Sequence, residues 1–238
     1  LYYLGWDEHM YRLFSSFLDP NFAGAFFVLF LLLILPKILQ RNSIFYSVIA
    51  ILTVGAIFLT FSRSAVLMFV ASSTILLILL GKKKWIFAIL GVVIIAFVAS
   101  SKYFYIENIN PFRTVSTEAR LETASNAIAI IKDNPLLGVG FNAYRYAQVR
   151  YGFRSEVNAL KSHADAAPDN SFLFVLATTG IIGFIAYLFI WYRILKNAHS
   201  AVVIASIIGV FINSFFINRL FFPPLMLWMW MLVAVMDY

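Results

Sequence analysis

Arg63 is the one charged residue in an apolar stretch that covers residues 43–80. As a single helix this stretch would rise about 57 Å, which is about twice the ~30 Å thickness of a bilayer's hydrocarbon core. The chain must therefore cross the membrane, turn and cross back. The turn is expected at residues 60–64, where the polar side chains of the stretch gather around Arg63. The sequence thus predicts a two-helix hairpin that holds a permanent cation close to the membrane surface.

The position of Arg63 permits two interpretations. A guanidinium within the hydrocarbon costs about 2.5–3.5 kcal/mol even on the lenient insertion scale, so intramembrane arginines usually face a polar cavity or an anion. This makes Arg63 a candidate anion-binding residue. Alternatively, the side chain extends to the interface and only marks the turn.

The composition places the chain among polytopic helical membrane proteins. It is 62% hydrophobic and 12% charged, with a mean hydropathy of +0.88, which excludes an ordinary soluble domain. The sequence has no cysteine, so disulfides and thiolate metal sites are excluded. It begins with Leu1, without an initiator methionine or a recognisable signal peptide, and we expect that the N-terminal part of a longer protein is missing.

Hydropathy predicts an all-α bundle with about seven membrane spans. The spans are expected at residues 17–35, 43–61, 64–80, 85–100, 171–192, 198–216 and 221–236. The charged residues of the short loops on one side are all basic, namely Lys37, Arg41, Lys82, Lys83, Lys84, Arg193 and Lys196. By the positive-inside rule this side is cytoplasmic, so Arg63, Arg219 and the long segment 101–170 face outward. We therefore expect a multi-pass protein of the cytoplasmic (inner) membrane.

This topology divides the chain into three parts. Residues 1–100 hold four spans and the Arg63 hairpin, residues 101–170 form a large extracytoplasmic loop, and residues 171–238 hold three spans. The acidic and basic residues of the loop are nearly balanced, as in a folded and solvated element.

An amphipathic helix is predicted over residues 117–132 of the loop. Ser116 or Thr117 can cap it, and Pro135 prevents its continuation. Arg120 falls in its first turn, where a positive charge opposes the helix dipole unless it binds an anion. The expected apolar face consists of Leu121, Ala124, Ile128 and Ile131.

The outward-facing groups Arg63, Arg120 and Asp169–Asn170 can converge on one site. Two guanidiniums suit a phosphate or pyrophosphate, since each offers paired donors and keeps its charge. A carboxylate beside them can accept a proton from a hydroxyl nucleophile. The alternative for Asp169 is that it caps the fifth span.

Other polar residues near this site carry weaker predictions. Tyr144 and Arg145 are added as substrate-binding candidates, because an aromatic face can stack on a sugar ring, although packing is the more common role for a tyrosine. His163, Asp165 and Asp169 lie on one polar loop, but such a loop is more typical of a solvated turn, and no metal or other cofactor is predicted.

Several motifs resemble the O-antigen ligase and polymerase superfamily, from about Asp19 to Gly183. They are Leu18-Asp19-Pro20-Asn21, Ser62-Arg63-Ser64-Ala65, Ala119-Arg120-Leu121, Asn134-Pro135-Leu136-Leu137-Gly138-Val139-Gly140, Pro168-Asp169-Asn170-Ser171-Phe172-Leu173 and Thr179-Gly180-Ile181-Ile182-Gly183. The resemblance implies a metal-independent, inverting GT-C glycosyltransferase. Such an enzyme takes glycan from an undecaprenyl-pyrophosphate carrier on the outer face of the membrane. Family members usually have more than seven spans.

The resemblance also implies roles for particular residues. Arg63 and Arg120 correspond to the two arginines that hold the donor pyrophosphate. Asp169 falls where ligases commonly carry a histidine before an asparagine, and this departure favours the polymerase branch. His163 could stand in for that histidine, but a shift of this size would change the geometry.

The function expected from these observations is polymerisation of undecaprenyl-pyrophosphate-linked repeat units. The alternatives are an O-antigen ligase that transfers the glycan to lipid A core, a transporter of an anionic lipid or solute, and an assembly protein that uses the loop for docking. Expected partners are the lipid-linked glycan, an acceptor glycan or lipid, membrane lipid and a chain-length regulator, and no nucleic acid is expected.

Overall fold

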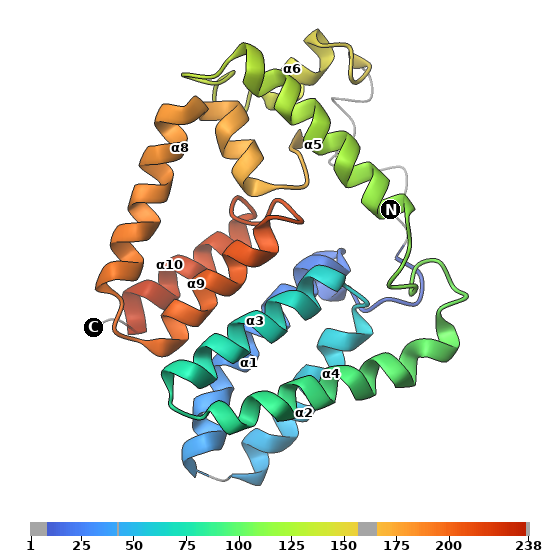
Figure 1. Ribbon diagram of the computed structural model, residues 1–238, viewed down its shortest axis with the longest axis vertical. Coiled ribbons are helices and arrows are strands. Elements are labelled where there is room, and N and C mark those ends of the chain that lie inside the picture. The colour runs from blue at the N-terminus through green and yellow to red at the C-terminus, as the bar shows by residue number, and fades with distance from the viewer. Residues whose placement is uncertain (1–8, 42, 157–165, 237–238) are drawn as a thin grey trace. The chain divides into compact units, whose positions relative to one another are not determined.

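The computed structural model describes residues 9–41, 43–156 and 166–236, and every regular element in these ranges is a helix (Figure 1). The predicted all-α class is confirmed for this part of the chain. The chain forms two compact units, which we describe separately. The bundle unit contains His9–Arg113, Ala198–Asn213 and the described residues from Pro224 onward. The loop unit contains the described residues of Thr114–Asn197 together with Ser214–Pro223.

Apolar helices occupy each of the predicted spans. They are α1 (Pro20–Arg41), α2 (Ile44–Leu59), α3 (Arg63–Leu79), α4 (Ile86–Ser100), α8 (Ser171–Asn197), α9 (Ala201–Ser214) and α10 (Pro223–Met236). Helix α1, helix α8 and the segment Lys83–Tyr103 around α4 are long and apolar enough to cross a membrane, and the other four are shorter. These helices suit a multi-pass membrane protein, and the number of crossings stays a prediction.

The turn between α2 and α3 lies at residues 60–62, within the predicted turn region. Ser62 begins α3 as its N-cap, since its hydroxyl accepts a hydrogen bond from the backbone N–H of Ala65 (3.3 Å). The same hydroxyl donates to Asn21 Oδ1 of α1 (2.7 Å). A Cβ at Gly24 of α1 would lie 2.6 Å from Ala65 Cβ, so the two helices approach closely only because this residue is glycine. The turn is therefore anchored on α1.

Helix α9 packs on α3 through small and polar residues. A Cβ on Gly209 would lie 2.7 Å from Ser72 Cβ, and Asn213 Nδ2 donates to the carbonyl of Ser64 (2.8 Å). Small residues allow close helix contact in membrane proteins, where lipid is as apolar as the helix surfaces.

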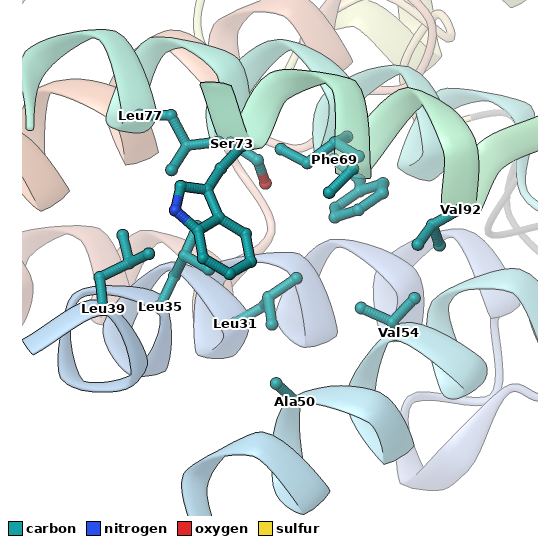
Figure 2. Close-up of a pocket in the computed structure, with 12 residues that line it drawn as sticks. Leu31, Leu35, Leu39, Ala50, Val54, Phe69, Ser73, Leu77 and Val92 are labelled. Carbon is teal, nitrogen blue, oxygen red and sulfur yellow. The ribbon is translucent and has the colours of Figure 1, made fainter. Parts of the chain in front are cut away.

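A cavity of about 150 Å³ lies among α1, α2, α3 and α4 of the bundle unit (Figure 2). Leucines of α1 line one side of it, and Phe69, Ser73 and Leu77 of α3 line another. The lining is apolar except for the hydroxyl of Ser73 and the indole nitrogen of Trp85. It offers no acid, base or cation, so this cavity is not a candidate for the chemistry.

In the loop unit, α5 (Val115–Asp133) corresponds to the predicted amphipathic helix, but it begins earlier than predicted. The expected caps Ser116 and Thr117 lie inside the helix, and Thr114 occupies the N-cap position without a side-chain cap. Arg120 consequently lies in the second turn, where the helix dipole acts on it more weakly. The end of the helix at Asp133 agrees with the prediction.

The predicted apolar face of α5 is only partly correct, because Ile131 packs against the core of the loop unit but Leu121 and Ile128 do not. Leu121 is 66% exposed and Ile128 is 43% exposed, whereas Ala127 and Ile130 are fully buried. These two residues belong to the core of the loop unit, together with Tyr144, Ala147, Phe174 and Ala177 of α6 (Tyr144–Arg150) and α8. Tertiary packing selects the buried face here because the charged residues of α5 lie on both sides of its apolar positions.

Helix α8 is not the single straight span that hydropathy predicts. Gly180 has φ 64° and ψ −171°, a conformation available essentially to glycine alone, and it divides α8 into residues 171–179 and 181–197. Figure 1 shows the two parts of α8 meeting at a sharp bend. The first part packs on α5 and α6, so the chain at Asp169–Asn170 leads into a short helix of the loop unit.

Backbone groups that the break leaves without helical partners bond to residues 135–140. The N–H groups of Val139 and Gly140 donate to the carbonyls of Ala177 and Thr178 (2.9 Å each). In the other direction, Ile181 N–H donates to the carbonyl of Pro135 (2.9 Å). The segment after α5 therefore supplies hydrogen-bond partners for the backbone groups at the break in α8. Buried backbone polar groups require such partners.

Candidate functional site

In the bundle unit, Arg63 is the first residue of α3 and is partly buried. Its Nη1 donates to the carbonyl of Pro111 (3.2 Å) and to the carbonyl of Arg113 (3.4 Å). The side chain therefore does not simply extend into solvent, because it joins the α2–α3 turn to the segment that follows α4.

Two further arginines meet the same turn. Arg113 is 8% exposed, and its Nη1 donates to the carbonyls of Phe61 (3.5 Å), Asn108 (3.4 Å) and Asn110 (3.3 Å). Arg12 Nε donates to the carbonyl of Thr60 (2.9 Å). Carbonyls at the C-terminus of a helix carry partial negative charge and attract cations. Arg12 and Arg113 thus bind the carbonyls that follow α2, next to Arg63 at the start of α3. Of these three arginines, the sequence singled out only Arg63.

In the loop unit, Thr123 connects Arg120 with Asp169. The backbone N–H of Asp169 donates to Thr123 Oγ1 across 3.5 Å, and this hydroxyl in turn donates to the carbonyl of Arg120 (3.1 Å). The turn of α5 that carries Arg120 therefore lies beside Asp169. Sequence reasoning did not identify Thr123, because nothing in the local pattern distinguishes it from the other small residues of α5.

Asn170, and not Asp169, caps α8. Its Oδ1 accepts hydrogen bonds from the backbone N–H groups of Phe172 (2.9 Å) and Leu173 (3.0 Å), which is the geometry of an N-cap. Its Nδ2 donates to the carbonyl of Phe215 (3.2 Å). The alternative that Asp169 serves as the cap is therefore wrong, and its carboxylate is not used in capping.

The connection between α9 and α10 is held against the start of α8. Ser171 Oγ accepts hydrogen bonds from the backbone N–H groups of Arg219 (2.9 Å) and Leu220 (3.2 Å). The same hydroxyl donates to Asn218 Oδ1 (3.0 Å). Arg219 is fully buried. Sequence analysis used Arg219 only to orient the chain. In the structure its backbone N–H bonds to Ser171, which follows Asp169 by two positions in the sequence.

The other predicted substrate-binding residues lie on α6. Tyr144 is 1% exposed and packs edge to face on Phe174, with ring centroids 6.1 Å apart. Burial raises the pKa of Tyr144 above its usual range. In this arrangement Tyr144 packs in the core of the loop unit, and its role in substrate binding stays a prediction. Arg145, the next residue, is partly exposed.

Surface contacts attach the segment after α6 to α5. Tyr151 donates to Asp133 Oδ2 (2.9 Å), and this hydrogen bond raises the pKa of Tyr151. Arg154 pairs with Glu122 of α5 at 2.6 Å. His163 and Asp165, which the metal and histidine alternatives involve, lie outside the described residues.

The apolar helices, with arginines concentrated at their ends, define a multi-pass helical membrane protein. A family model described as O-antigen ligase matches residues 48–188, which is more than half of the chain. The chain therefore belongs to the O-antigen ligase family, which confirms the resemblance seen in its motifs. No curated protein sequence and no solved structure matches the chain significantly.

Proposed function

We propose that this protein is a glycosyltransferase that polymerises undecaprenyl-pyrophosphate-linked oligosaccharide repeat units at the outer face of the cytoplasmic membrane. The observation that carries the proposal is the family match, because residues 48–188 include Arg63, Arg120 and Asp169. The distribution of charge supports it. Guanidiniums gather at the start of α3, and Arg120 lies beside Asp169 in the loop unit.

The proposed chemistry follows from the leaving group. The acceptor hydroxyl oxygen bonds to the anomeric carbon of the donor, while the bond from that carbon to the pyrophosphate oxygen breaks with its electron pair. Because negative charge develops on the pyrophosphate, fixed cations lower the barrier. Arg63 and Arg120 supply this charge, and inversion results from attack on the face opposite the leaving group.

Asp169 takes the hydroxyl proton or orients the hydroxyl. Asn170, and not Asp169, caps α8, so this role of Asp169 does not compete with capping. An aspartate has an ordinary pKa of about 3.9, so it is a weak base at neutral pH. Orientation and electrostatic stabilisation therefore contribute alongside proton transfer in this proposal.

The replacement Asp169→Asn tests this role. It removes the negative charge and preserves size, so we expect the turnover number to fall about 10²-fold or more, the scale of general base catalysis. The thermal midpoint should change little, because the cap at Asn170 is retained. Glu118→Gln is the matched control, since Glu118 is an exposed acid on α5. Near wild-type turnover in Asp169→Asn would exclude a chemical role for this carboxylate.

Thr123 is a positioning residue in the same proposal. Thr123→Val keeps the side-chain shape but removes the hydroxyl between Arg120 and Asp169, so the turnover number should fall by up to about 100-fold. Thr123→Ser retains the hydroxyl and should restore most of the activity, with KM similar in both variants. Equal turnover in the valine and serine variants would show that the hydroxyl has no positioning role.

The assay for the function uses purified protein in nanodiscs and lipid-linked repeat units as the only substrate. A ladder of longer lipid-linked products is expected from a polymerase. If products appear only after lipid A core is added, the protein is a ligase, which is the second candidate. The family match supports the two equally, and the aspartate at position 169 favours the polymerase.

A transporter of anionic lipid is the remaining alternative. Among the described helices, α8 is interrupted at Gly180. Transporters of this kind use a matching pair of interrupted helices from two repeats, and the break in α8 is filled by residues 135–140 of the chain itself. The break therefore does not favour transport.

A further inference from the structure

Residues 135–141, which we call the insertion loop, have no role in the function proposed above. They connect α5 with α6 and contain no charged residue, and the nearest charges on either side are Asp133 and Arg145. Such a loop on the surface of a solvated domain is ordinarily polar. Its composition instead resembles that of the apolar helices.

The insertion loop turns its apolar side chains outward. Leu136 is 63% exposed, Leu137 is 73% exposed and Phe141 is 71% exposed. These three residues are among the larger side chains of the loop, and together they form an apolar patch on the loop unit. Exposed apolar patches on this scale mark contact with another protein or with lipid.

The patch continues along α8 beyond the break. Ile181 N–H donates to the carbonyl of Pro135 (2.9 Å), and Ile182 N–H donates to the carbonyl of Leu136 (3.5 Å), so the loop lies against the start of residues 181–197. On that part of α8, Ile182 and Ile185 are 57% and 60% exposed. This is the apolar surface by which a membrane-spanning helix faces lipid.

Several backbone groups of the insertion loop meet the condition for entering hydrocarbon. Irregular backbone survives at membrane depth only where the protein itself satisfies its polar groups. Here the carbonyls of Pro135 and Leu136 accept from α8, and the N–H groups of Gly138 and Val139 donate to the carbonyls of Asn134 (3.1 Å) and Ala177 (2.9 Å). Glycine is required at position 138, because a Cβ there would lie 2.5–2.7 Å from backbone atoms of residues 177–179.

We infer that the insertion loop is a re-entrant wedge whose apolar side chains enter the hydrocarbon of the leaflet that borders the loop unit. Bilayer lipid is the occupant that the continuity with α8 favours over a protein partner. Val139 and Gly140 join the wedge to residues 171–179 of α8 through their hydrogen bonds to Ala177 and Thr178. The wedge therefore sets the depth of the loop unit. This inference does not depend on which reaction the protein catalyses.

Site-directed spin labelling tests the inference directly. The 238-residue sequence has no cysteine, so single-cysteine variants of this chain can be labelled without background from other positions in it. Leu137→Cys and Phe141→Cys report on the wedge. Ile185→Cys on α8 serves as the lipid-facing control, and Ser125→Cys, at an exposed position of α5, serves as the water-facing control. Each nitroxide is measured in nanodiscs of phosphatidylethanolamine and phosphatidylglycerol.

The readout is the accessibility of each nitroxide to oxygen relative to a polar nickel chelate. We expect a ratio at positions 137 and 141 that is several-fold above the ratio at 125 and close to that at 185. Ratios equal to the value at 125 would place the loop in water and overturn the inference. Low accessibility to both reagents would also overturn it, since that result means that protein covers the loop. Size-exclusion profiles identify any variant that does not fold, and the second labelled position then provides the test.

Discussion

Replacement of Arg63 or Arg120 by alanine should reduce glycan transfer by about 10²–10³-fold each, the scale observed when one donor that stabilises a developing oxyanion is removed. The loss should fall mainly on the turnover number, because negative charge on the pyrophosphate is greatest in the transition state. Rates and KM values measured with a lipid-linked donor separate this effect from weaker substrate binding.

Controls must allow for the structural contacts of Arg63. Its hydrogen bonds to the carbonyls of Pro111 and Arg113 join the α2–α3 turn to the next segment, so Arg63→Ala can also lower stability. Arg63→Lys keeps the charge but not the paired donors. Its rate of glycan transfer should lie between the rates of the wild type and of Arg63→Ala. Arg150→Ala removes an exposed arginine from the end of α6 and should leave the rate unchanged. Wild-type product lengths in both alanine variants would eliminate the pyrophosphate-binding role.

Gly180→Ala should destabilise the protein by about 4 kcal/mol or more, which is the range of severe single substitutions. The φ and ψ of Gly180 are strained for any residue with a side chain, and a Cβ would also overlap the carbonyl group of Leu136. Neither the break nor the insertion loop can shift without loss of their mutual hydrogen bonds. We expect a large fall in the thermal midpoint in detergent and poor recovery of monodisperse protein.

Two other glycines separate the causes of this effect. Gly91 lies inside α4, and a Cβ there would meet no atom within 4 Å, so Gly91→Ala should be neutral or stabilising by up to about 1 kcal/mol. Gly81 has φ +70° but equally open surroundings, so Gly81→Ala should cost about 1–2 kcal/mol from backbone strain alone. If Gly180→Ala is no worse than Gly81→Ala, the close contact with Leu136 does not exist in the folded protein.

The candidate site illustrates what a sequence pattern can predict. Arg63 was identifiable because a lone charge in an apolar stretch is costly, and that cost is a property of composition. Asp169 and Asn170 were correctly identified as a place where α8 begins. Which of the two caps the helix could not be predicted, because both side chains suit an N-cap and the difference depends on which oxygen meets the N–H groups of Phe172 and Leu173.

Hydropathy by itself determined the class of this protein and the position of each apolar helix, because the removal of apolar side chains from water depends on composition along the chain. It could not show the break in α8, the buried face of α5 or the gathering of Arg12 and Arg113 around the start of α3. Each of these arises from hydrogen bonds and packing between segments distant in sequence. Tertiary structure alone decided them, since a backbone group leaves its helical partner only where another segment supplies a replacement.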